Sequence, residues 1–445
     1  MSEYTSNRPI LAARKFTSKA VEKVIKEFKE NVDNKELAWL FENCFPNTID
    51  TTVNFKIEKG KPDTFVITGD IDAMWLRDST AQVWPYLQLC NEDEELKQMI
   101  AGLINRQTKC ILIDPYANAF NDGAAPSEWE SDHTDMKPEL HERKWEIDSL
   151  CYAIRLAYGY WRETRDISCF DKTWFESIKL VEKTFVEQQR KENTGPYSFM
   201  RTTNRLTDTV AGFGYGNPIK PVGLICSMFR PSDDSTIYPF LIPSNLFAVV
   251  SLRQAEEMVT AIFNDNVFAA ELKTLADEVE QAVKDYAIST HLEFNEIYAY
   301  EVDGFGNKVY MDDSNIPSLL SLPYLGAFDS NDGVYKSTRK FLHSDSNPYF
   351  FKGKAAEGIG GPHVGLDYIW PMSITMRALT STDDDEIKEC IKMLVNTHGG
   401  AGFMHEGFHK DDPKKFTRKW FAWSNTLFGE LILKTYKTKP ELLNF

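Results

Sequence analysis

Two neighbouring carboxylates stand between prolines in an otherwise apolar stretch of the chain. Asp233 and Asp234 lie in the segment Arg230-Pro-Ser-Asp-Asp-Ser-Thr-Ile-Tyr-Pro239. Close carboxylates raise one another's pKa, and burial raises it further. A carboxyl group that stays protonated near neutral pH can act as a general acid. The same residues could also form an Asx-turn or a helix cap, so the pattern alone leaves both readings open.

A glycine-rich segment near the C-terminus carries another candidate carboxylate. Glu406 lies in Gly399-Gly-Ala-Gly-Phe-Met-His-Glu-Gly-Phe-His409, where the glycines would let the backbone approach a ligand closely. A glutamate in this setting could be the base that activates a water molecule. His405 and His409 have the spacing of a metal-binding pair, but the H-E-x-x-H order is absent, so we expect no metal.

An acidic and aromatic stretch, Thr68–Thr80, has the composition of a sugar-binding wall. Its charged residues surround an indole: Asp70, Asp72, Trp75, Arg77 and Asp78. Carboxylates and a guanidinium exchange hydrogen bonds with hydroxyls, and an indole covers the C–H face of a sugar ring. A structural interpretation is also open, with Asp78 as a helix cap, Arg77 as its ion-pair partner and Trp75 in the core.

Three further segments could complete the same site. Their candidate residues are Asn315 in Met311–Tyr324, His363 and Trp370 in Gly360–Pro371, and Trp420 after the glycine-rich segment. Each could equally be a cap or a packing residue. Glu146 and Asp148 lie two positions apart near an expected helix start, which predicts different faces of that helix. Carboxylates and aromatics in loops before successive helices favour glycoside hydrolysis, in which two carboxyl groups flank the bond that breaks.

Helical periodicity recurs along the chain and supplies the elements that would position these loops. Apolar stripes predict helices near 21–28, 174–185, 272–286 and 387–395, and further helices at 148–164 (which Asp148 could cap), 244–263, 366–379 and 424–435. Strands are expected only at 64–68 and at 297–301 with 308–311, and long loops at 108–147, 190–242, 287–325 and 396–423. No linker interrupts the chain, so we expect one helical toroid over residues 1–445, with the site on its loop face.

Composition narrows the classes of partner. The chain has 445 residues and a formal net charge of -16, which argues against nucleic acid and anionic membranes as partners. Aromatic residues make up 13% of the chain, which is compatible with a neutral sugar ligand. The composition gives no indication of oligomeric state.

Cysteine usage and the N-terminus bear on the compartment. The seven cysteines are scattered and form no C-x-x-C pair, which favours free, buried thiols in a reducing compartment. No apolar signal-peptide core or membrane-spanning run is visible. We therefore favour the cytoplasm for the chain as given, and the periplasm or secretion if a signal has been removed.

Several motifs together resemble those of glycoside hydrolase family 125, the exo-acting α-1,6-mannosidases. The matching segments follow the family order over nearly the whole chain: Thr68–Thr80, Arg230–Ser235, Asp312–Tyr324, Gly360–Trp370 and Met404–Phe408. The resemblance implies an all-α fold, an (α/α)6 barrel with short β-hairpins in its loops. It also implies metal-independent hydrolysis without a cofactor, with inversion at the anomeric carbon and release of terminal mannose from α-mannoside oligosaccharides such as N-glycan fragments.

The resemblance also assigns roles to residues of this chain. It implies that Asp233 is the general acid, with the adjacent Asp234 as the alternative, and that Glu406 is the general base. Arg77 and Asp78 would hold the terminal mannose.

Alternatives from other classes remain open at this point. The chain could be another (α/α)6 glycosidase of glucoamylase type, or a carbohydrate-binding protein that uses the same aromatic cleft without catalysis. A sugar epimerase on a similar toroid would need histidine acid/base pairs, for which the candidates are His363, His398, His405 and His409.

Overall fold

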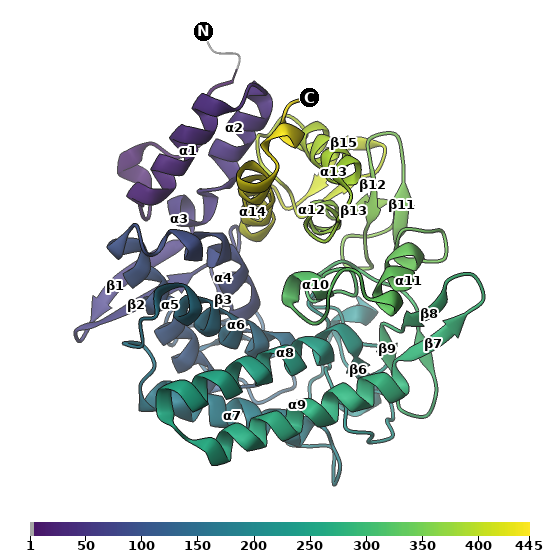
Figure 1. The fold of residues 1–445 in the computed structure, drawn as a ribbon. Helices are drawn as coiled ribbons and strands as arrows, with labels where there is room; N and C mark the ends of the chain where they lie inside the picture. The colour runs from purple at the N-terminus through teal and green to yellow at the C-terminus, as the bar shows by residue number, and fades with distance from the viewer. Residues whose placement is uncertain (1–3) are drawn as a thin grey trace.

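Two concentric rings of helices make up the molecule, seen along their common axis in Figure 1. The computed structural model describes residues 4–445, so the first three residues of the N-terminal segment lie outside it. The inner ring consists of α4 (Leu76–Val83), α6 (Ile147–Thr164), α8 (Ile242–Met258), α10 (Leu322–Leu325), α12 (Pro371–Leu379) and α14 (Ala422–Thr438). The outer ring consists of α2 (Lys35–Cys44), α5 (Glu94–Ile113), α7 (Lys172–Gln188), α9 (Asn266–Tyr286), α11 (Gly333–Leu342) and α13 (Asp384–Thr397). The predicted (α/α)6 barrel is confirmed.

The helix sequences explain which ring each helix joins. Outer helices are amphipathic; α9, for example, buries a stripe that includes Leu272, Val279 and Val283 and exposes its other face. Inner helices pack on both sides and are buried nearly all round; every residue of α4 is buried, including the polar residues Arg77, Asp78 and Gln82. Inner neighbours α4, α6 and α8 pack in sequence, and α14 closes the ring by packing against both α12 and α4.

The two rings differ in how their helices begin. Every outer helix starts at an Asp or Asn whose side chain accepts hydrogen bonds from the first turn: Asn34, Asp93, Asp171, Asp265, Asp332 and Asp383. None of the inner helices named above has a side-chain cap at its first turn. The first N–H groups of the inner helices are instead bonded to other segments of the chain: Leu76 donates to the Asn118 carbonyl oxygen, Ile242 to the Tyr300 carbonyl oxygen and Ala422 to the Thr68 carbonyl oxygen.

Small antiparallel sheets tie these loops together, and no large sheet is present in residues 4–445. Their strands are β1 (Val53–Glu58), β2 (Lys61–Val66), β3 (Met74–Trp75), β4 (Ala119–Phe120), β5 (Leu140–Glu142), β6 (Phe240–Leu241), β7 (Ile288–His291), β8 (Asn295–Tyr298), β9 (Glu301–Val302), β10 (Lys308–Val309), β11 (Phe350–Lys352), β12 (Glu357–Ile359), β13 (Tyr368–Ile369), β14 (Gly407–His409) and β15 (Asp412–Thr417). Strands β3, β6 and β13 lead directly into the inner helices α4, α8 and α12. Pairing of β3 with β4, of β6 with β9 and of β13 with β14 holds the chain just before these three helices.

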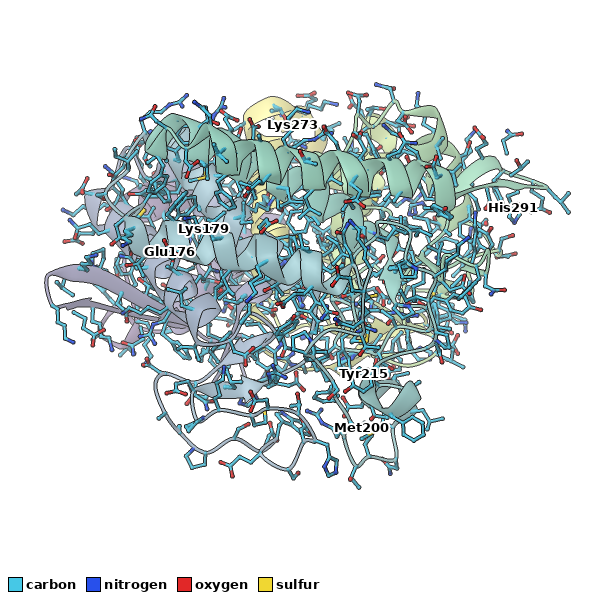
Figure 2. The ribbon with its side chains drawn as sticks, turned by 90° about the horizontal axis from the view of Figure 1, so that it is seen from below. Glu176, Lys179, Met200, Tyr215, Lys273 and His291 are labelled. Carbon is cyan, nitrogen blue, oxygen red and sulfur yellow. The ribbon has the colours of Figure 1, made fainter. Side chains whose placement is uncertain are left out.

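The long loops gather on one side of the rings. Figure 2 looks across the axis and shows Met200 and Tyr215 on this loop side, whereas Lys273 of α9 lies at the opposite side. The remaining helices, α1 (Lys19–Asn31) and α3 (Asn47–Thr51), precede the first inner helix. All seven cysteines are buried and free, as predicted. Within residues 4–445, no helix is both long enough and apolar enough to cross a bilayer.

Several predicted boundaries were wrong. The segment 366–370 is not helical, because Tyr368–Ile369 pairs with β14 as strand β13 and Pro371 then begins α12. Residues 108–113 belong to α5 and not to a loop, and the expected strand at 297–301 is divided between β8 and β9. Asp148 does not cap α6; Glu146 holds the N-cap position, and Asp148 lies in the first turn.

Candidate active site

The loops before the inner helices enclose a small cavity on the loop side of the barrel. Its walls are Thr68, Ile71, Trp75, Arg77, Asp78, Pro231, Ser232, Asp233, Asn315, His363, Trp370, Glu406, Arg418, Phe421 and Trp423. These residues come from segments far apart in the sequence, each close to the start of an inner helix. The cavity therefore gathers most of the predicted site residues: Trp75, Arg77, Asp78, Asp233, Asn315, His363, Trp370 and Glu406.

Three predicted site residues are placed elsewhere. Asp72 is exposed and is not part of the cavity wall. Trp420 is also not in the wall; its carbonyl oxygen accepts a hydrogen bond from the Asp70 N–H at 3.3 Å, so it supports the loop before α4 from behind. Asp234 is buried behind the wall, where its carboxylate accepts a hydrogen bond from Arg205 at 3.1 Å.

Arg77 is the hub of the charged wall. Its side chain is 3% exposed, and its Nη1 lies 2.5 Å from Glu146 Oε2 and 3.1 Å from Asp148 Oδ2. Its Nη2 lies 3.2 Å from Asp233 Oδ1, and its Nε lies 3.5 Å from Asp78 Oδ2. One guanidinium thus faces carboxyl groups from α4, from the start of α6 and from the loop before α8.

The loop that carries Asp233 is held in an unusual conformation. Asp233 has φ +65°, a left-handed conformation that is uncommon for a residue with a side chain. Lys144 Nζ donates to its carbonyl oxygen at 2.9 Å, and the Arg230 N–H donates to the Asp234 carbonyl oxygen at 2.8 Å. Asn118 Nδ2 also donates to Asp233 Oδ1 at 3.4 Å. Because of this turn, the side chains of the two neighbouring aspartates point in different directions. The side chain of Asp233 is 25% exposed, whereas that of Asp234 is only 2% exposed.

The charges around Arg77 perturb one another strongly. Burial alone would raise the pKa of Asp233, but Arg77 and Lys144 hold it well below its ordinary value. Burial raises the pKa of Glu146 well above its ordinary value, and raises the pKa of Asp148 to about 6. Burial also raises the pKa of Asp78 to about 6, although Arg77 opposes this shift.

Glu406 lies on the far wall, just before β14, and is 5% exposed. Its Oε1 is 3.5 Å from Arg418 Nη1 and 3.9 Å from His363 Nε2. Arg418 in turn pairs with Asp70 at 2.5 Å and lies over the ring of Phe421. The candidate base is therefore held between a guanidinium and an imidazole.

His363 connects the loop of the candidate acid with the candidate base. Its Nδ1 lies 3.7 Å from Asp234 Oδ1, on the opposite side of the ring from Glu406. Burial would lower the pKa of His363, but the Asp234 carboxylate outweighs this and raises it. Arg205 donates to the His363 carbonyl oxygen at 3.1 Å and so joins the loop at 205–208 to the same wall.

The aromatic wall offers unused hydrogen-bond donors. The indole Nε1 atoms of Trp75 and Trp370 are buried and have no hydrogen-bond partner among residues 4–445. Both indoles line the cavity, so a ligand hydroxyl could accept from them. Trp75 is only 6% exposed, so it is buried as a core residue would be, and it also lines the cavity wall. The sequence left these two interpretations open, and both hold.

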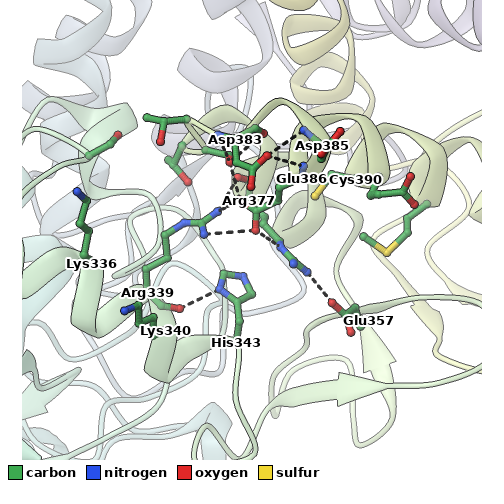
Figure 3. A pocket seen from close by; sticks show the side chains of 16 residues that line it. Lys336, Arg339, Lys340, His343, Glu357, Arg377, Asp383, Asp385, Glu386 and Cys390 are labelled. Atoms are coloured by element: carbon green, nitrogen blue, oxygen red, sulfur yellow. Dashed lines mark hydrogen bonds and ion pairs between the residues drawn. The ribbon is translucent and has the colours of Figure 1, made fainter. Parts of the chain in front are cut away.

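A wider surface cleft lies between α11, α12 and α13 and is drawn in Figure 3. Its central charges pair with one another: Arg339 pairs with Glu386 at 2.7 Å, and Arg377 pairs with Glu386 at 2.8 Å and with Glu357 at 2.9 Å. This network joins neighbouring helices. We place the chemistry in the smaller cavity because that cavity gathers most of the predicted site residues.

The residues present fit acid/base chemistry on a polyhydroxylated ligand. The carboxylates, the guanidinium and the unpartnered indole N–H groups that line the cavity can bind hydroxyls, and the carboxylates can exchange protons. Among the cavity residues His363 is the only histidine, whereas His398 accepts from backbone N–H groups and contacts Glu36, and His405 stacks on Phe416. The histidine pair that an epimerase would need is not assembled there. Within residues 4–445, no group of three or more His, Cys, Asp or Glu side chains is arranged to hold a metal ion.

Some site residues were not predicted from the sequence. Arg418 lines the cavity, and Lys144, Asn118 and Glu146 surround Asp233. Glu146 and Asp148 were expected on different faces of a helix, but both contact the same Arg77 Nη1 because Glu146 has extended backbone torsions, with φ −131° and ψ 124°. The segment Lys144–Asp148 did carry a signal, a dense run of charges at a helix start.

Comparisons with known proteins identify the family of the chain. The family described as metal-independent α-mannosidase (GH125) matches residues 34–433. The Meiotically up-regulated gene 157 protein of Schizosaccharomyces pombe is 41% identical over 455 residues, covering 98% of this chain and 89% of that protein.

Solved structures place the chain in the same group. An α-mannosidase from Streptococcus pneumoniae, described as a non-productive substrate complex with α-1,6-mannobiose, is 43% identical with a TM-score of 0.91 and covers 96% of this chain and 100% of that chain. A bacterial glucoamylase complexed with acarbose has a TM-score of 0.56 at 12% identity, covering 95% of this chain and 59% of that chain. The likeness to the glucoamylase concerns the fold alone.

Proposed function

The chain belongs to glycoside hydrolase family 125, the metal-independent α-mannosidases, and we propose that it releases terminal α-1,6-linked mannose from the non-reducing ends of α-mannoside oligosaccharides such as N-glycan fragments. The observation that carries this proposal is the cavity in which Asp233 and Glu406 line the same space as the sugar-holding candidates Arg77 and Asp78. The α-1,6-mannobiose named with the S. pneumoniae relative supports the choice of linkage.

We assign the general acid to Asp233 and not to Asp234. The Asp233 side chain reaches the cavity, whereas Asp234 is buried and engaged by Arg205 and His363. A general acid must come within hydrogen-bonding reach of the oxygen that leaves. Only Asp233 of this pair is placed to protonate the glycosidic oxygen of a sugar in the cavity.

Glu406 is assigned as the general base. It would take a proton from a water molecule as that water attacks the anomeric carbon, while the bond to the leaving oxygen breaks and Asp233 supplies that oxygen with a proton. The water adds on the face opposite the leaving group, so the product is β-mannose. Arg418 and His363 stand beside Glu406 and would keep its carboxylate turned toward the cavity.

We propose inversion because the assigned roles are a general acid and a general base, with no nucleophile. Inverting enzymes keep their carboxyl groups roughly 6.5–9.5 Å apart so that a water fits between the base and the sugar, whereas a retaining enzyme needs its nucleophile closer to the acid. Asp233 and Glu406 come from different segments of the chain and line the same cavity.

The sugar-holding groups lie together in one wall of the cavity. Arg77, Asp78 and the indole N–H groups of Trp75 and Trp370 lie in the wall formed by the inner-helix N-termini. Hydroxyls of a single ring can pair with these donors and acceptors, so we propose that this wall binds the terminal mannose.

The roles are tested by three substitutions and two substrates. Asp233→Asn and Glu406→Gln should each lower kcat on α-1,6-mannobiose by about 10²- to 10⁴-fold, the usual contribution of a general acid or base. Because fluoride leaves without protonation, D233N should keep near wild-type turnover of α-mannosyl fluoride, and E406Q should not. Asp234→Asn is the matched control for the acid. If D234N shows the D233N pattern and D233N remains active on mannobiose, the assignment of the acid is wrong.

A further inference from the structure

The residues around Asp233 favour its ionised form, although a general acid must carry a proton. A neighbouring group must therefore hold this proton, and the contacts of Asp233 indicate Glu146. Two cationic side chains, Arg77 and Lys144, contact Asp233, through its carboxylate and its carbonyl oxygen respectively. Such neighbours favour the ionised form of an aspartate, which has no proton to give. An acid in this position needs a partner that retains a proton for it.

Four carboxyl groups surround the single positive charge of Arg77, so at least one of them must keep its proton. Asp78, Glu146, Asp148 and Asp233 all face this one guanidinium, and Glu146 and Asp148 have fully buried side chains. Buried carboxylates that share one positive charge cannot all ionise near neutral pH. Lys144 does not cancel the excess, because it also pairs with Glu142 and Asp208.

Hydrogen bonding points to Glu146 as the holder. Its Oε2 accepts from Arg77 at 2.5 Å and from Ser149 Oγ at 3.0 Å. Its Oε1 is buried and has no hydrogen-bond partner among residues 4–445, and the same is true of Asp148 Oδ1. Glu146 and Asp233 contact neighbouring nitrogens of the Arg77 guanidinium, and of these two buried carboxyls Glu146 is the one that can hydrogen-bond to Asp233 when it carries a proton.

We propose that Glu146 and Asp233 form a carboxyl pair that shares one proton, and that Glu146 holds this proton in the resting enzyme for Asp233 to deliver to the leaving oxygen. This inference rests on the proposed function, since it supplies the acid of the proposed hydrolysis. Glu146 acts through Asp233 and is a positioning residue, because it does not line the cavity.

The proton balance follows from this pairing. The O–H bond of Glu146 breaks as Asp233 becomes the carboxylic acid, and Asp233 then loses a proton to the glycosidic oxygen as the C–O bond breaks. The electron pair of that bond goes to the leaving oxygen, and a water molecule gives its hydroxyl to the sugar and its proton to Glu406. After product release, Glu406 loses its proton to solvent and the pair regains one from solvent.

Other groups around the pair set the pH range over which it keeps its proton. Arg77 and Lys144 favour ionisation, while Asp78 and Asp148 disfavour it, and His363 and His141 also lie close enough to act on Asp233 or respond to it. The pair should therefore titrate as a unit and set the alkaline limb of the pH profile of kcat/KM.

The test compares Glu146→Gln with wild type on α-1,6-mannobiose and on α-mannosyl fluoride. Glutamine keeps the shape of Glu146 but carries no titratable proton. We expect E146Q to lose at least about tenfold of its mannobiose activity at pH 7, with an alkaline limb moved to lower pH. Fluoride turnover should stay within about threefold of wild type, because that step needs no acid.

Two further variants separate this role from a structural one. Asp148→Asn removes the other carboxyl on the same Arg77 nitrogen. Because Asp148 disfavours ionisation of the pair, we expect the alkaline limb of D148N on mannobiose to move to lower pH, but by less than that of E146Q. Ser149→Ala removes a donor to Glu146, so we expect the alkaline limb for mannobiose to move up by about half a unit. The proposal is overturned if E146Q affects both substrates equally, if its mannobiose profile matches wild type, or if the S149A limb does not move. If D233N stays active on mannobiose, the proposed function itself fails, whatever E146Q does.

Discussion

Asp78 carries a stability cost that its proposed role in holding the sugar would explain. Burial raises the pKa of this carboxyl from 3.8 to about 6. Below pH 3.8 the group is neutral in both the folded and the unfolded chain. Between pH 3.8 and about 6 the unfolded chain ionises while the folded protein does not, so stability falls as the pH rises and the loss is complete above about pH 6.

The size of this cost follows from the shift. A rise of about two pKa units corresponds to about 3 kcal/mol at neutral pH. Asparagine mimics the neutral carboxyl, so Asp78→Asn should be about 3 kcal/mol more stable than wild type at pH 7.5 and no more stable at pH 3.5. At about 2.1 cal/mol/K of unfolding entropy per residue, this is a rise of about 3 °C in Tm for a chain of 445 residues.

The assay is thermal unfolding of D78N and wild type across pH 3.5 to 7.5, with kcat/KM on α-1,6-mannobiose measured alongside. Activity should fall about tenfold to a hundredfold, the range for a lost hydrogen bond to a charged group. Asp72→Asn is the matched control, because Asp72 is exposed in the loop just before α4 and its substitution should leave Tm unchanged across this pH range. A Tm difference for D78N that is absent, or equal at both ends of the pH range, would refute the reasoning.

Three other predictions concern the frame of the site and its chemistry. Gly69 has φ +128°, and a Cβ at this position would lie 2.5 Å from the Trp420 carbonyl oxygen. Gly69→Ala should therefore displace the Thr68–Trp75 loop and lower both Tm and activity. Wild-type values of both would contradict this prediction. Arg230 and Glu301 form a buried pair at 2.6 Å, so Arg230→Leu should cost about 3–5 kcal/mol in thermal unfolding, and adding Glu301→Gln should recover part of the loss. Dialysis against EDTA should leave mannose release unchanged, and a loss restored by a divalent cation would count against metal-independent hydrolysis.

The sequence was informative wherever a local signal determines structure. Outer helices have acidic or Asn caps and amphipathic stripes, and the stripes near 174–185, 272–286 and 387–395 lie within α7, α9 and α13. Inner helices lack capping side chains, so their starts had to be inferred from hydrophobicity alone. The helix expected at 366–379 is present as α12, but its predicted start was wrong, because Tyr368–Ile369 pairs with β14 and the helix begins at Pro371.

The sequence predicted which residues belong to the site better than it predicted how they are arranged in space. Asp233, Glu406 and Arg77 could be identified from residue type and from the family resemblance. Which of two adjacent aspartates faces the cavity depends on the left-handed torsion at Asp233, and no local pattern encodes it. The convergence of Glu146 on Arg77 depends on contacts between segments far apart in the chain, which residue spacing cannot report.

The central claim is hydrolysis of α-1,6-linked mannose by single displacement, with Asp233 as acid and Glu406 as base. The most direct measurement is ¹H NMR of the first turnovers on α-1,6-mannobiose, before mutarotation mixes the anomers. The account predicts that β-mannose appears first and that α-mannose grows in only by mutarotation. Initial release of α-mannose, or no cleavage of the α-1,6 bond beside cleavage of another linkage, would contradict it.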